Sequence, residues 1–211
     1  MNTNKTSLRI RVAGLALVLI VAAMVLAIST TSANIPHNSM LSENFLETEE
    51  NLQRFDRQAN LNKVNAKLTA ELEAQLECLA LNIYHEARSE SRTGQRAVAW
   101  VTLNRVKDPK FPNTVCGVVY QARVDSNGNP LRHQCQFSWY CDGKSDRIND
   151  RIEWMNAQQV ARQVWKNHTK NLDIDPTMGA VMYHATWMES FPNWANNFVK
   201  VVRIDNHVFY K

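Results

Sequence analysis

The chain has 211 residues, of which 45% are apolar, and a formal net charge of +4. This allows one modest globular domain with attachments. Residues 1–33 contribute +3, residues 34–77 contribute −4 and residues 78–211 contribute +5. A mildly basic globular part suits a polyanionic polymer. The absence of a basic run with interleaved aromatic residues argues against a nucleic-acid-binding protein.

The first segment of the chain has the pattern of an export signal. Residues 12–28, VAGLALVLIVAAMVLAI, are uncharged and apolar and follow a basic start. The small residues TSAN at 31–34 are like those before a cleavage site, whereas the length of the apolar run approaches that of a membrane span. We expect residues 1–33 to be a cleaved signal peptide or an uncleaved anchor, with the rest of the chain exported.

The next segment is polar and leads into the predicted domain. Residues 34–70 carry apolar side chains only at rough helical spacing, which predicts a helical or partly disordered stalk. The stalk is either a solvated linker or a coil that binds a partner. We expect a domain over residues 71–211, whose first helix runs over about 61–88.

The second helix of the domain has recognisable start and stop signals. Thr93 is a predicted N-cap for a helix over 94–107. The run DPKFP ends this helix, because proline cannot continue it and restricts the residue before it. Thr114 is expected to start a short helix through Gln121.

The C-terminal half mixes irregular, helical and strand patterns. Residues 122–148 are predicted to be irregular, with a turn at NGNP and a possible strand and loop in CQFSWYCDG. A long helix is expected over 150–168 and a strand in AVMYHAT, residues 180–186. The chain should close in a hairpin that turns at Asp205 and Asn206. Together these elements predict an α+β class, mainly helical with a small β element, behind an N-terminal signal or anchor helix.

The chain contains four cysteines, Cys78, Cys116, Cys135 and Cys141. An even number in an exported chain suggests up to two disulfides, in any of three pairings. A zinc site is the alternative, but it needs a closely spaced pair, and Cys135 and Cys141 are too far apart for the usual ligand knuckle. We therefore favour disulfides and expect no metal.

One carboxylate interrupts an apolar helix stripe. Leu76, Leu79 and Ile83 follow helical spacing, and the next position on the stripe is Glu86. A carboxyl group among apolar neighbours has a raised pKa and can act as a general acid. Cleavage of a glycosidic bond needs such an acid. The alternative is that the stripe reaches the surface at the helix end, which leaves Glu86 solvated.

A second carboxylate is harder to find. Glu90 lies on the same helix face as Glu86, so the two cannot flank a bond from opposite sides, and Glu90 is expected to be a solvated end residue. Asp142, Asp146 and Glu189 are further candidates without a supporting pattern.

Histidine and aromatic residues suggest two other kinds of site. A zinc amidase assembled from His85, His133 and His184 is an alternative, but the His spacing of the zinc-protease helix motif is absent from the sequence. Aromatic residues gather in two loops that either line a glycan groove or belong to the core. They are Phe137, Trp139 and Tyr140 in the first loop, and Trp187 and Trp194 in the second, near Tyr183.

A long stretch of the sequence resembles a known family. The run ALNIYHEARSESRTGQRAVAWVTLNRVKDPKFPNTVCGVVYQ, followed by CQFSWYCDGK, DPTMGAVMYHAT and NHVFY, resembles the cell wall hydrolases that include the spore-cortex-lytic enzymes. The resemblance is collinear over about residues 76–211. It implies a compact lysozyme-like domain that acts on peptidoglycan, with the glutamate of the EAR element, Glu86, as catalytic acid.

The resemblance also implies a mechanism like that of lytic transglycosylases. Glu86 would protonate the glycosidic oxygen between N-acetylmuramic acid and N-acetylglucosamine. It would then assist attack by the muramic 6-hydroxyl, which leaves a 1,6-anhydro end without water, a second carboxylate or a cofactor. The alternatives are a hydrolytic muramidase, an N-acetylmuramoyl-L-alanine amidase and a non-catalytic peptidoglycan-binding protein.

Beyond Glu86, several residues are candidates for binding glycan strands. They are Tyr183, Ser138, Gln95, Phe137, Trp139 and His184. Asn104 is a weaker candidate that could instead be a buried structural amide. The sequence leaves the oligomeric state open.

The sequence departs from the spore enzymes in its membrane-targeting start, its cysteines and the lack of a recognisable N-terminal peptidoglycan-binding repeat. These departures suggest an enzyme of the periplasm of a Gram-negative cell, or of its phage. Residues 12–28 would hold it at the inner membrane if they are not cleaved.

Overall fold

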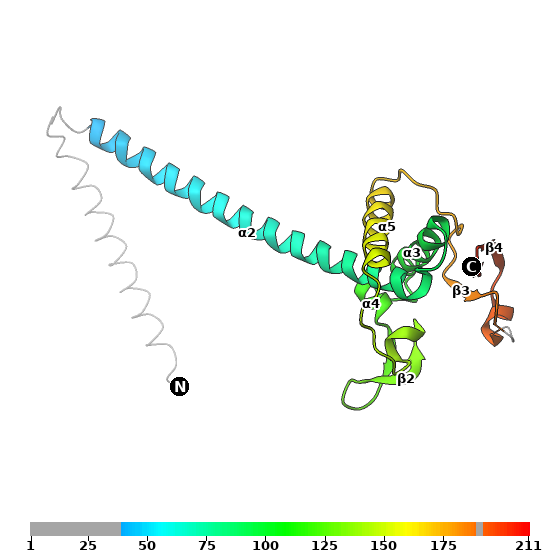
Figure 1. The fold of residues 1–211 in the computed structure, drawn as a ribbon. Helices are drawn as coiled ribbons and strands as arrows, with labels where there is room; N and C mark the ends of the chain where they lie inside the picture. The colour runs from blue at the N-terminus through cyan, green and yellow to red at the C-terminus, as the bar shows by residue number, and fades with distance from the viewer. Residues whose placement is uncertain (1–38, 189–191) are drawn as a thin grey trace, which may run out of the picture. The chain divides into compact units, whose positions relative to one another are not determined.

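The computed structural model describes residues 39–188 and 192–211. Within these ranges the chain is mainly helical and carries two small antiparallel sheets (Figure 1), as the α+β prediction requires. The predicted signal or anchor, with its apolar run at 12–28, lies outside the described residues. Among the helices that are described, none combines the length and apolar character that crossing a membrane requires.

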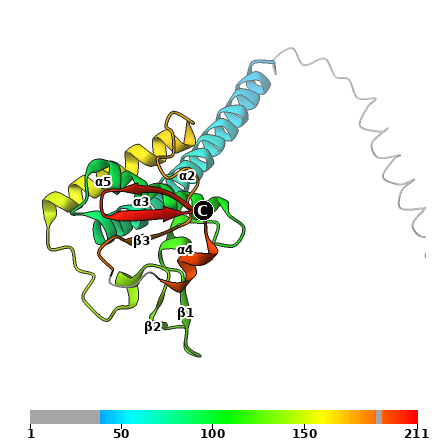
Figure 2. The same ribbon diagram turned by 90° about the vertical axis from the view of Figure 1, so that its right-hand side faces the viewer.

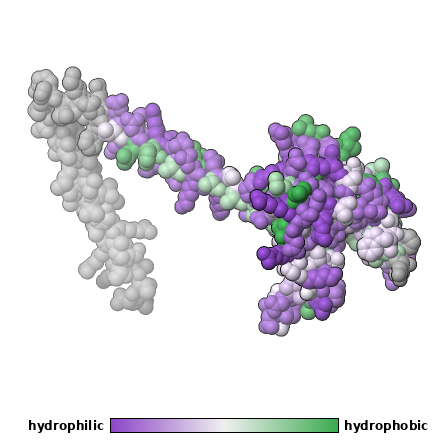
Figure 3. Space-filling view, viewed as in Figure 1, coloured by the Kyte–Doolittle hydropathy of each residue, from purple (hydrophilic) through white to green (hydrophobic). Residues whose placement is uncertain are grey.

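The first described helix, α2, spans Ser39–Ala87 and is longer than the helix predicted over 61–88. It includes the described part of the predicted stalk, where residues 47–74 are all exposed. Figure 3 shows hydrophobic side chains scattered among hydrophilic ones on α2. Phe55 and Leu68 are exposed hydrophobic residues of this helix. The compact unit that carries the candidate site is Asn62–Lys211, so its boundary falls within α2.

Three further helices pack on the C-terminal turns of α2. They are α3 (Arg92–Lys107), α4 (Val115–Val119) and α5 (Arg151–Thr169). Their shared core includes Leu79 and Ile83 of α2, Leu103 of α3, Val118 of α4, and Val160 and Val164 of α5. The stripe recognised in the sequence is therefore the surface on which the helical part of the domain assembles.

A distant side chain supports the start of α3. The predicted N-cap, Thr93, is wrong: the cap is Ser91, whose hydroxyl oxygen accepts from the Gly94 N–H at 3.3 Å. Asp205 in turn accepts from the Ser91 backbone N–H at 3.0 Å and from its hydroxyl at 2.6 Å. Local spacing alone could not reveal a cap that depends on a residue of the C-terminal hairpin.

The other two helix starts rest on local caps. Thr114 caps α4 as predicted, because its hydroxyl oxygen accepts from the Gly117 N–H at 3.0 Å. Asp150 caps α5 through bonds of 3.0 Å from the N–H groups of Ile152 and Glu153. These side chains satisfy backbone donors that a first helical turn leaves unpaired.

The region predicted to be irregular contains short regular elements. Strands β1 (Ala122–Val124) and β2 (Pro130–Cys135) pair antiparallel, and a 3₁₀ helix, η1 (Ser138–Cys141), follows. Both strands are largely exposed, so they lack the alternation that marks a half-buried strand in sequence. The cysteine pairs left open by the sequence are Cys78–Cys116 and Cys135–Cys141 in the structure.

A three-stranded sheet closes the domain with the order β3-β5-β4 (Figure 2). Its strands are β3 (Met182–Ala185), β4 (Lys200–Ile204) and β5 (His207–Tyr210), and a second 3₁₀ helix, η2 (Asn193–Asn197), precedes β4. The predicted hairpin is confirmed, because Ile204 pairs with His207 across the turn.

The sheet packs on α3 and thereby orients β3. Phe209 of the central strand is fully buried with Ala97 and Val101 of α3 and with Ala180. Tyr183 of β3 pairs in register with Phe209 and packs against the same cluster. The sheet therefore fixes where Tyr183 lies relative to the helices.

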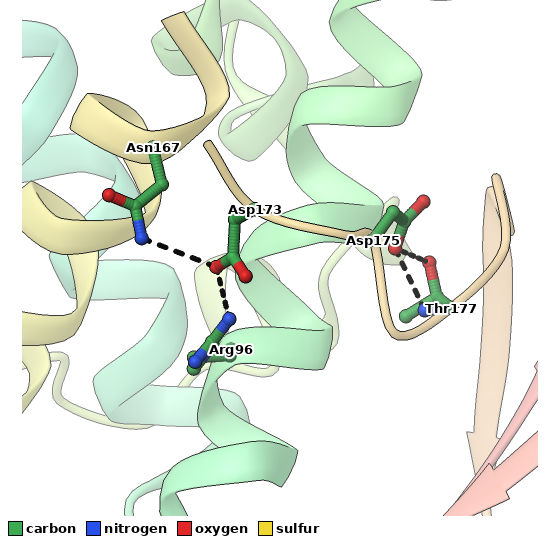
Figure 4. Close-up of polar contacts among 5 residues, drawn as sticks. All are labelled: Arg96, Asn167, Asp173, Asp175 and Thr177. Carbon is green, nitrogen blue, oxygen red and sulfur yellow. Dashed lines mark hydrogen bonds and ion pairs between the residues drawn. The ribbon is translucent and has the colours of Figure 1, made fainter. Parts of the chain in front are cut away.

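Polar contacts tie the segment between α5 and β3 to α3 (Figure 4). Asp173 forms an ion pair with Arg96 of α3 and accepts from the Asn167 amide at 3.4 Å. Asp175 accepts from the Thr177 N–H at 2.8 Å and from its hydroxyl at 2.6 Å. These contacts hold the chain where it enters β3.

Asn104 belongs to this network. Its amide donates to Asp175 at 2.8 Å, to Thr177 at 3.3 Å and to the Ala180 carbonyl at 3.0 Å. The structural interpretation of Asn104 therefore fits better than a role in binding substrate.

Candidate active site

A hollow of about 620 Å³ lies between the end of α2, the segment around η1 and strand β3. Most of the site residues predicted from the sequence line it. They are Glu86, Phe137, Ser138, Trp139, Tyr183 and His184. Three separate parts of the chain thus converge on one surface.

Glu86 is one of the residues that line this hollow. It lies in the last turn of α2 and is partly exposed. The Tyr183 hydroxyl donates a hydrogen bond to its Oε2 over 2.8 Å. Burial raises the pKa of Glu86, while the Tyr183 hydrogen bond and the positive charge of Arg105 oppose that rise. The fully solvated alternative does not describe this carboxyl group.

Tyr183 is held as a hydrogen-bond donor. Burial raises its pKa well above the usual value, and the neighbouring carboxylate of Glu86 raises the pKa further. Its ring packs edge-on against His207, with ring centroids 5.1 Å apart. A buried, neutral hydroxyl therefore faces Glu86.

Arg105 is a site residue that the sequence interpretation missed. It is 3% exposed, and its Nε donates to the Val181 carbonyl at 2.7 Å. Its guanidinium lies 4.8 Å from the centroid of the Phe137 ring. Burial lowers the pKa of Arg105 to about 10, which still leaves it charged at neutral pH. A signal was available, because Arg105 continues the buried stripe of α3 through Val101.

The aromatic wall of the hollow depends on α2. The indole N–H of Trp139 donates to Asn82 Oδ1 at 3.0 Å, and the Asn82 amide donates to the Thr102 hydroxyl at 3.1 Å. Trp139 also stacks on His85, with ring centroids 4.4 Å apart and an interplanar angle of 17°. Ser138, beside it, is exposed to the hollow.

His184 and two tryptophans of the second aromatic loop also contribute to the lining of the hollow. The His184 ring nitrogens lie 2.9 Å from the Ala185 carbonyl and 2.9 Å from the Tyr210 hydroxyl. Trp187, which is 78% exposed, and Trp194 also line the hollow. Aromatic side chains from both predicted loops therefore face the same space.

Two predictions at and just before the start of α3 need correction. Gln95 is buried outside the residues that line the hollow, and its amide donates to the Glu90 carbonyl at 3.4 Å. Glu90, which lies between α2 and α3 and lines the hollow, is not a free solvated end residue. Its two carboxylate oxygens accept from the Asn206 N–H at 3.1 Å and from the Asn206 side chain at 3.2 Å. Glu90 therefore braces the turn of the C-terminal hairpin, and Gln95 contacts Glu90.

The remaining charged candidates do not gather around Glu86. Asp142 lines the hollow, but it accepts from the Lys144 N–H at 2.8 Å and pairs with the Lys144 ammonium at 3.8 Å. Glu189 lies outside the described residues. His133 lies on β2 and does not line the hollow. Across residues 39–188 and 192–211, no three or more His, Cys, Asp and Glu residues are grouped to hold a metal ion.

Comparison with known proteins gives the class of the domain. The cell wall hydrolase family matches residues 89–210, which is more than half of the chain. The chain belongs to the cell wall hydrolase family. Glu86 lies just before the matched segment.

Its relatives include several spore cortex-lytic enzymes. That of Bacillus cereus is 48% identical over 136 residues, covering 64% of this chain and 44% of the relative. The enzyme of Bacillus subtilis is 30% identical over 131 residues, which cover 62% of this chain and 35% of the relative. The chain thus spans less than half the length of the curated relatives it matches.

Two solved structures are also similar. The catalytic domain of the Bacillus cereus SleB protein is 27% identical with a TM-score of 0.49, covering 66% of this chain and 91% of that one. The catalytic domain of the germination-specific lytic transglycosylase SleB of Bacillus anthracis is 27% identical, with a TM-score of 0.48. The match covers 65% of this chain and 93% of that one.

Proposed function

We propose that the chain is a peptidoglycan lytic transglycosylase in which Glu86 acts first as acid and then as base. Membership of the cell wall hydrolase family and the names of the relatives support the substrate class. The observation that carries the proposal is the partly buried Glu86, whose Oε2 accepts the Tyr183 hydroxyl inside an aromatic-walled hollow.

The acid step follows from the surroundings of Glu86. Burial raises its pKa, so that it holds a proton at a higher pH than a solvated glutamate does. Because Tyr183 donates to Oε2, we assign the acid proton to Oε1. Transfer of this proton to the glycosidic oxygen breaks the bond to the anomeric carbon, and the N-acetylglucosamine side leaves as an alcohol.

The base step uses the same carboxyl group after it has lost its proton. The Tyr183 hydrogen bond and the positive charge of Arg105 both favour the ionised form of Glu86. That carboxylate stabilises positive charge at the anomeric carbon and takes the proton of the muramic 6-hydroxyl as its oxygen attacks. The anhydro ring closes, and Glu86 regains the proton for the next cycle.

The contacts of the other carboxylates in the hollow favour this one-carboxylate route. Both oxygens of Glu90 are bonded to Asn206, and Asp142 is paired with Lys144. A hydrolytic muramidase would use the same glutamate and let water attack instead. Export and attachment through residues 12–28 stay predictions.

The decisive experiment incubates purified protein with peptidoglycan sacculi and identifies the products by mass. An anhydro end is one water lighter than a hydrolysed end, whereas an amidase would release stem peptides and lose activity with a chelator. We expect Glu86→Gln to lower the cleavage rate about 100-fold or more, since general acid–base catalysis contributes about 10²–10⁴-fold.

Glu77→Gln is a matched control, because Glu77 is an exposed carboxylate on the same helix. It should cleave at the wild-type rate. Equal cleavage by wild type and Glu86→Gln would refute the assignment of Glu86. Binding to sacculi without cleavage by either protein would favour a non-catalytic binding role.

A further inference from the structure

A second hollow, of about 430 Å³, adjoins the candidate active site. The two hollows share His85, Trp139 and Asp142, so the stacked pair of His85 and Trp139 forms the wall between them. The volume is within the range of about 300–1,000 Å³ that is typical of ligand sites. Most of its lining residues are charged or polar and belong to the segment from Asp142 to Asp150.

Three cations and three carboxylates line this second hollow, but two of the carboxylates already have other partners. Asp142 is paired with Lys144 at 3.8 Å, and Asp150 accepts from the first N–H groups of α5. Arg88 and Arg147 also line the hollow, and no ion pair recorded for the described residues involves either guanidinium. Asp146 is the third lining carboxylate, and none of the ion pairs recorded for the described residues involves it.

Arg88 is held by a rigid support. Its guanidinium carbon lies 5.2 Å from the centroid of the Tyr84 ring, which is 2% exposed. The Tyr84 hydroxyl oxygen accepts from the N–H groups of Asn149 at 3.1 Å and of Asp150 at 3.0 Å. Buried Tyr84 therefore positions both Arg88 and the chain at Asn149 and Asp150, all of which line the hollow.

From this arrangement we infer that the second hollow is a subsite for the stem peptide of peptidoglycan, with Arg88 and Arg147 binding its free carboxylates. The inference rests on the proposed function. Arginine is suited to this role because its planar guanidinium can bind a carboxylate through two parallel hydrogen bonds. Asp146 is placed to accept the ammonium of a diamino acid in the same peptide.

The guanidinium groups of Arg88 and Arg147 favour the peptide over the glycan. The amino sugars of the strand are uncharged, because the muramic lactyl carboxyl is consumed by the amide bond to the peptide. The stem peptide carries free carboxylates and starts on the same muramic sugar whose anomeric bond would lie at Glu86. An extended chain covers about 3.3–3.6 Å per residue, so a peptide of a few residues can pass the wall at Trp139.

The test compares two substrates and two variants. Sacculi with intact stem peptides are compared with glycan strands freed of them by an amidase, on which only the muramic lactyl carboxylate remains. The initial rates of glycan cleavage on the two substrates are expressed as a ratio. We expect the wild type to prefer intact sacculi. Arg88→Gln and Arg147→Gln should each reduce that preference about fivefold, since a solvent-exposed ion pair contributes up to about 1 kcal/mol.

Arg123→Gln is the matched control, because Arg123 is exposed on β1 and lines neither hollow. It should keep the wild-type ratio. A wild-type ratio of one, or a ratio that both variants leave unchanged, would overturn the peptide subsite while the proposed function stands. Failure of the wild type to cleave either substrate would instead overturn the proposed function, and the subsite with it.

Discussion

The hydroxyl of Tyr183 donates to Oε2 of Glu86 over 2.8 Å and joins strand β3 to the last turn of α2. The two residues are 97 positions apart in the chain. Glu86 is oriented by its own helix, whereas Tyr183 is oriented by the sheet that packs on α3. The geometry of the carboxyl group therefore depends on the whole domain being folded.

Replacing Tyr183 with phenylalanine should shift the pH dependence of cleavage. The hydrogen bond from Tyr183 lowers the pKa of Glu86, so its removal raises that pKa further. The limb of the profile on which the acid loses its proton should move to higher pH, and the maximal rate should fall about tenfold as the carboxyl group loses its fixed orientation. Initial rates measured on sacculi across a pH series test this, and an unmoved limb would contradict it.

Arg105 offers a pair of variants that separate charge from hydrogen bonding. Arg105→Lys keeps a cation near Glu86 but loses the Nε bond to the Val181 carbonyl, and Arg105→Met loses both. Leaving a buried acceptor without its partner costs about 1–3 kcal/mol, so both variants should unfold at lower urea concentration. Only Arg105→Met should also raise the pKa of Glu86, read from the pH profile of cleavage.

Glu86→Gln should stabilise the protein in a pH-dependent way. The pKa of Glu86 is raised above its usual 4.5 in the folded chain. The folded state therefore binds the proton more tightly, and the wild type loses stability as pH rises through the raised pKa. Glutamine does not titrate, so its advantage in melting temperature should be small below pH 4.5 and grow above it. A difference that is constant with pH would refute the raised pKa.

The two disulfides should respond differently to replacement by serine. Cys78–Cys116 closes a 38-residue separation between α2 and α4, and the chain-entropy estimate for such a loop is about 4 kcal/mol. Cys135–Cys141 closes a separation of 6 residues around Phe137, Ser138 and Trp139, and the corresponding estimate is about 2 kcal/mol.

Removing the Cys78–Cys116 disulfide should therefore lower the free energy of unfolding more. Removing the Cys135–Cys141 disulfide should cost more activity for the same loss of stability, because it frees Phe137, Ser138 and Trp139 at the hollow. Urea unfolding and cleavage rates of the two double-serine variants test this. Equal losses of activity at matched folded fraction would contradict it.

Several features could be predicted because they depend on neighbours in the sequence. The helices α3 and α5 follow from the spacing of apolar residues and from stop signals, and the hairpin follows from Asp205 and Asn206, the former with a positive φ of 47°. The exceptional position of Glu86 was visible in the same way, since residues three and four apart share a helix face.

Other features depend on segments that meet only in the folded chain. The cap at Ser91 relies on Asp205, the amide of Gln95 turns to Glu90 instead of the hollow, and the strands β1 and β2 lack a sequence pattern because they are largely exposed. Four cysteines allow three pairings, and only the positions of α2 and α4 decide which sulfur atoms meet.

The sequence by itself determined that a carboxyl group interrupts an apolar stripe, because a helix repeats its faces locally. It also carried the motifs that resemble cell wall hydrolases. Only the tertiary structure decided what surrounds that carboxyl group. Tyr183 and Arg105 reach Glu86 through the packing of a sheet on a helix, and desolvation, which raises its pKa, exists only once that packing is complete.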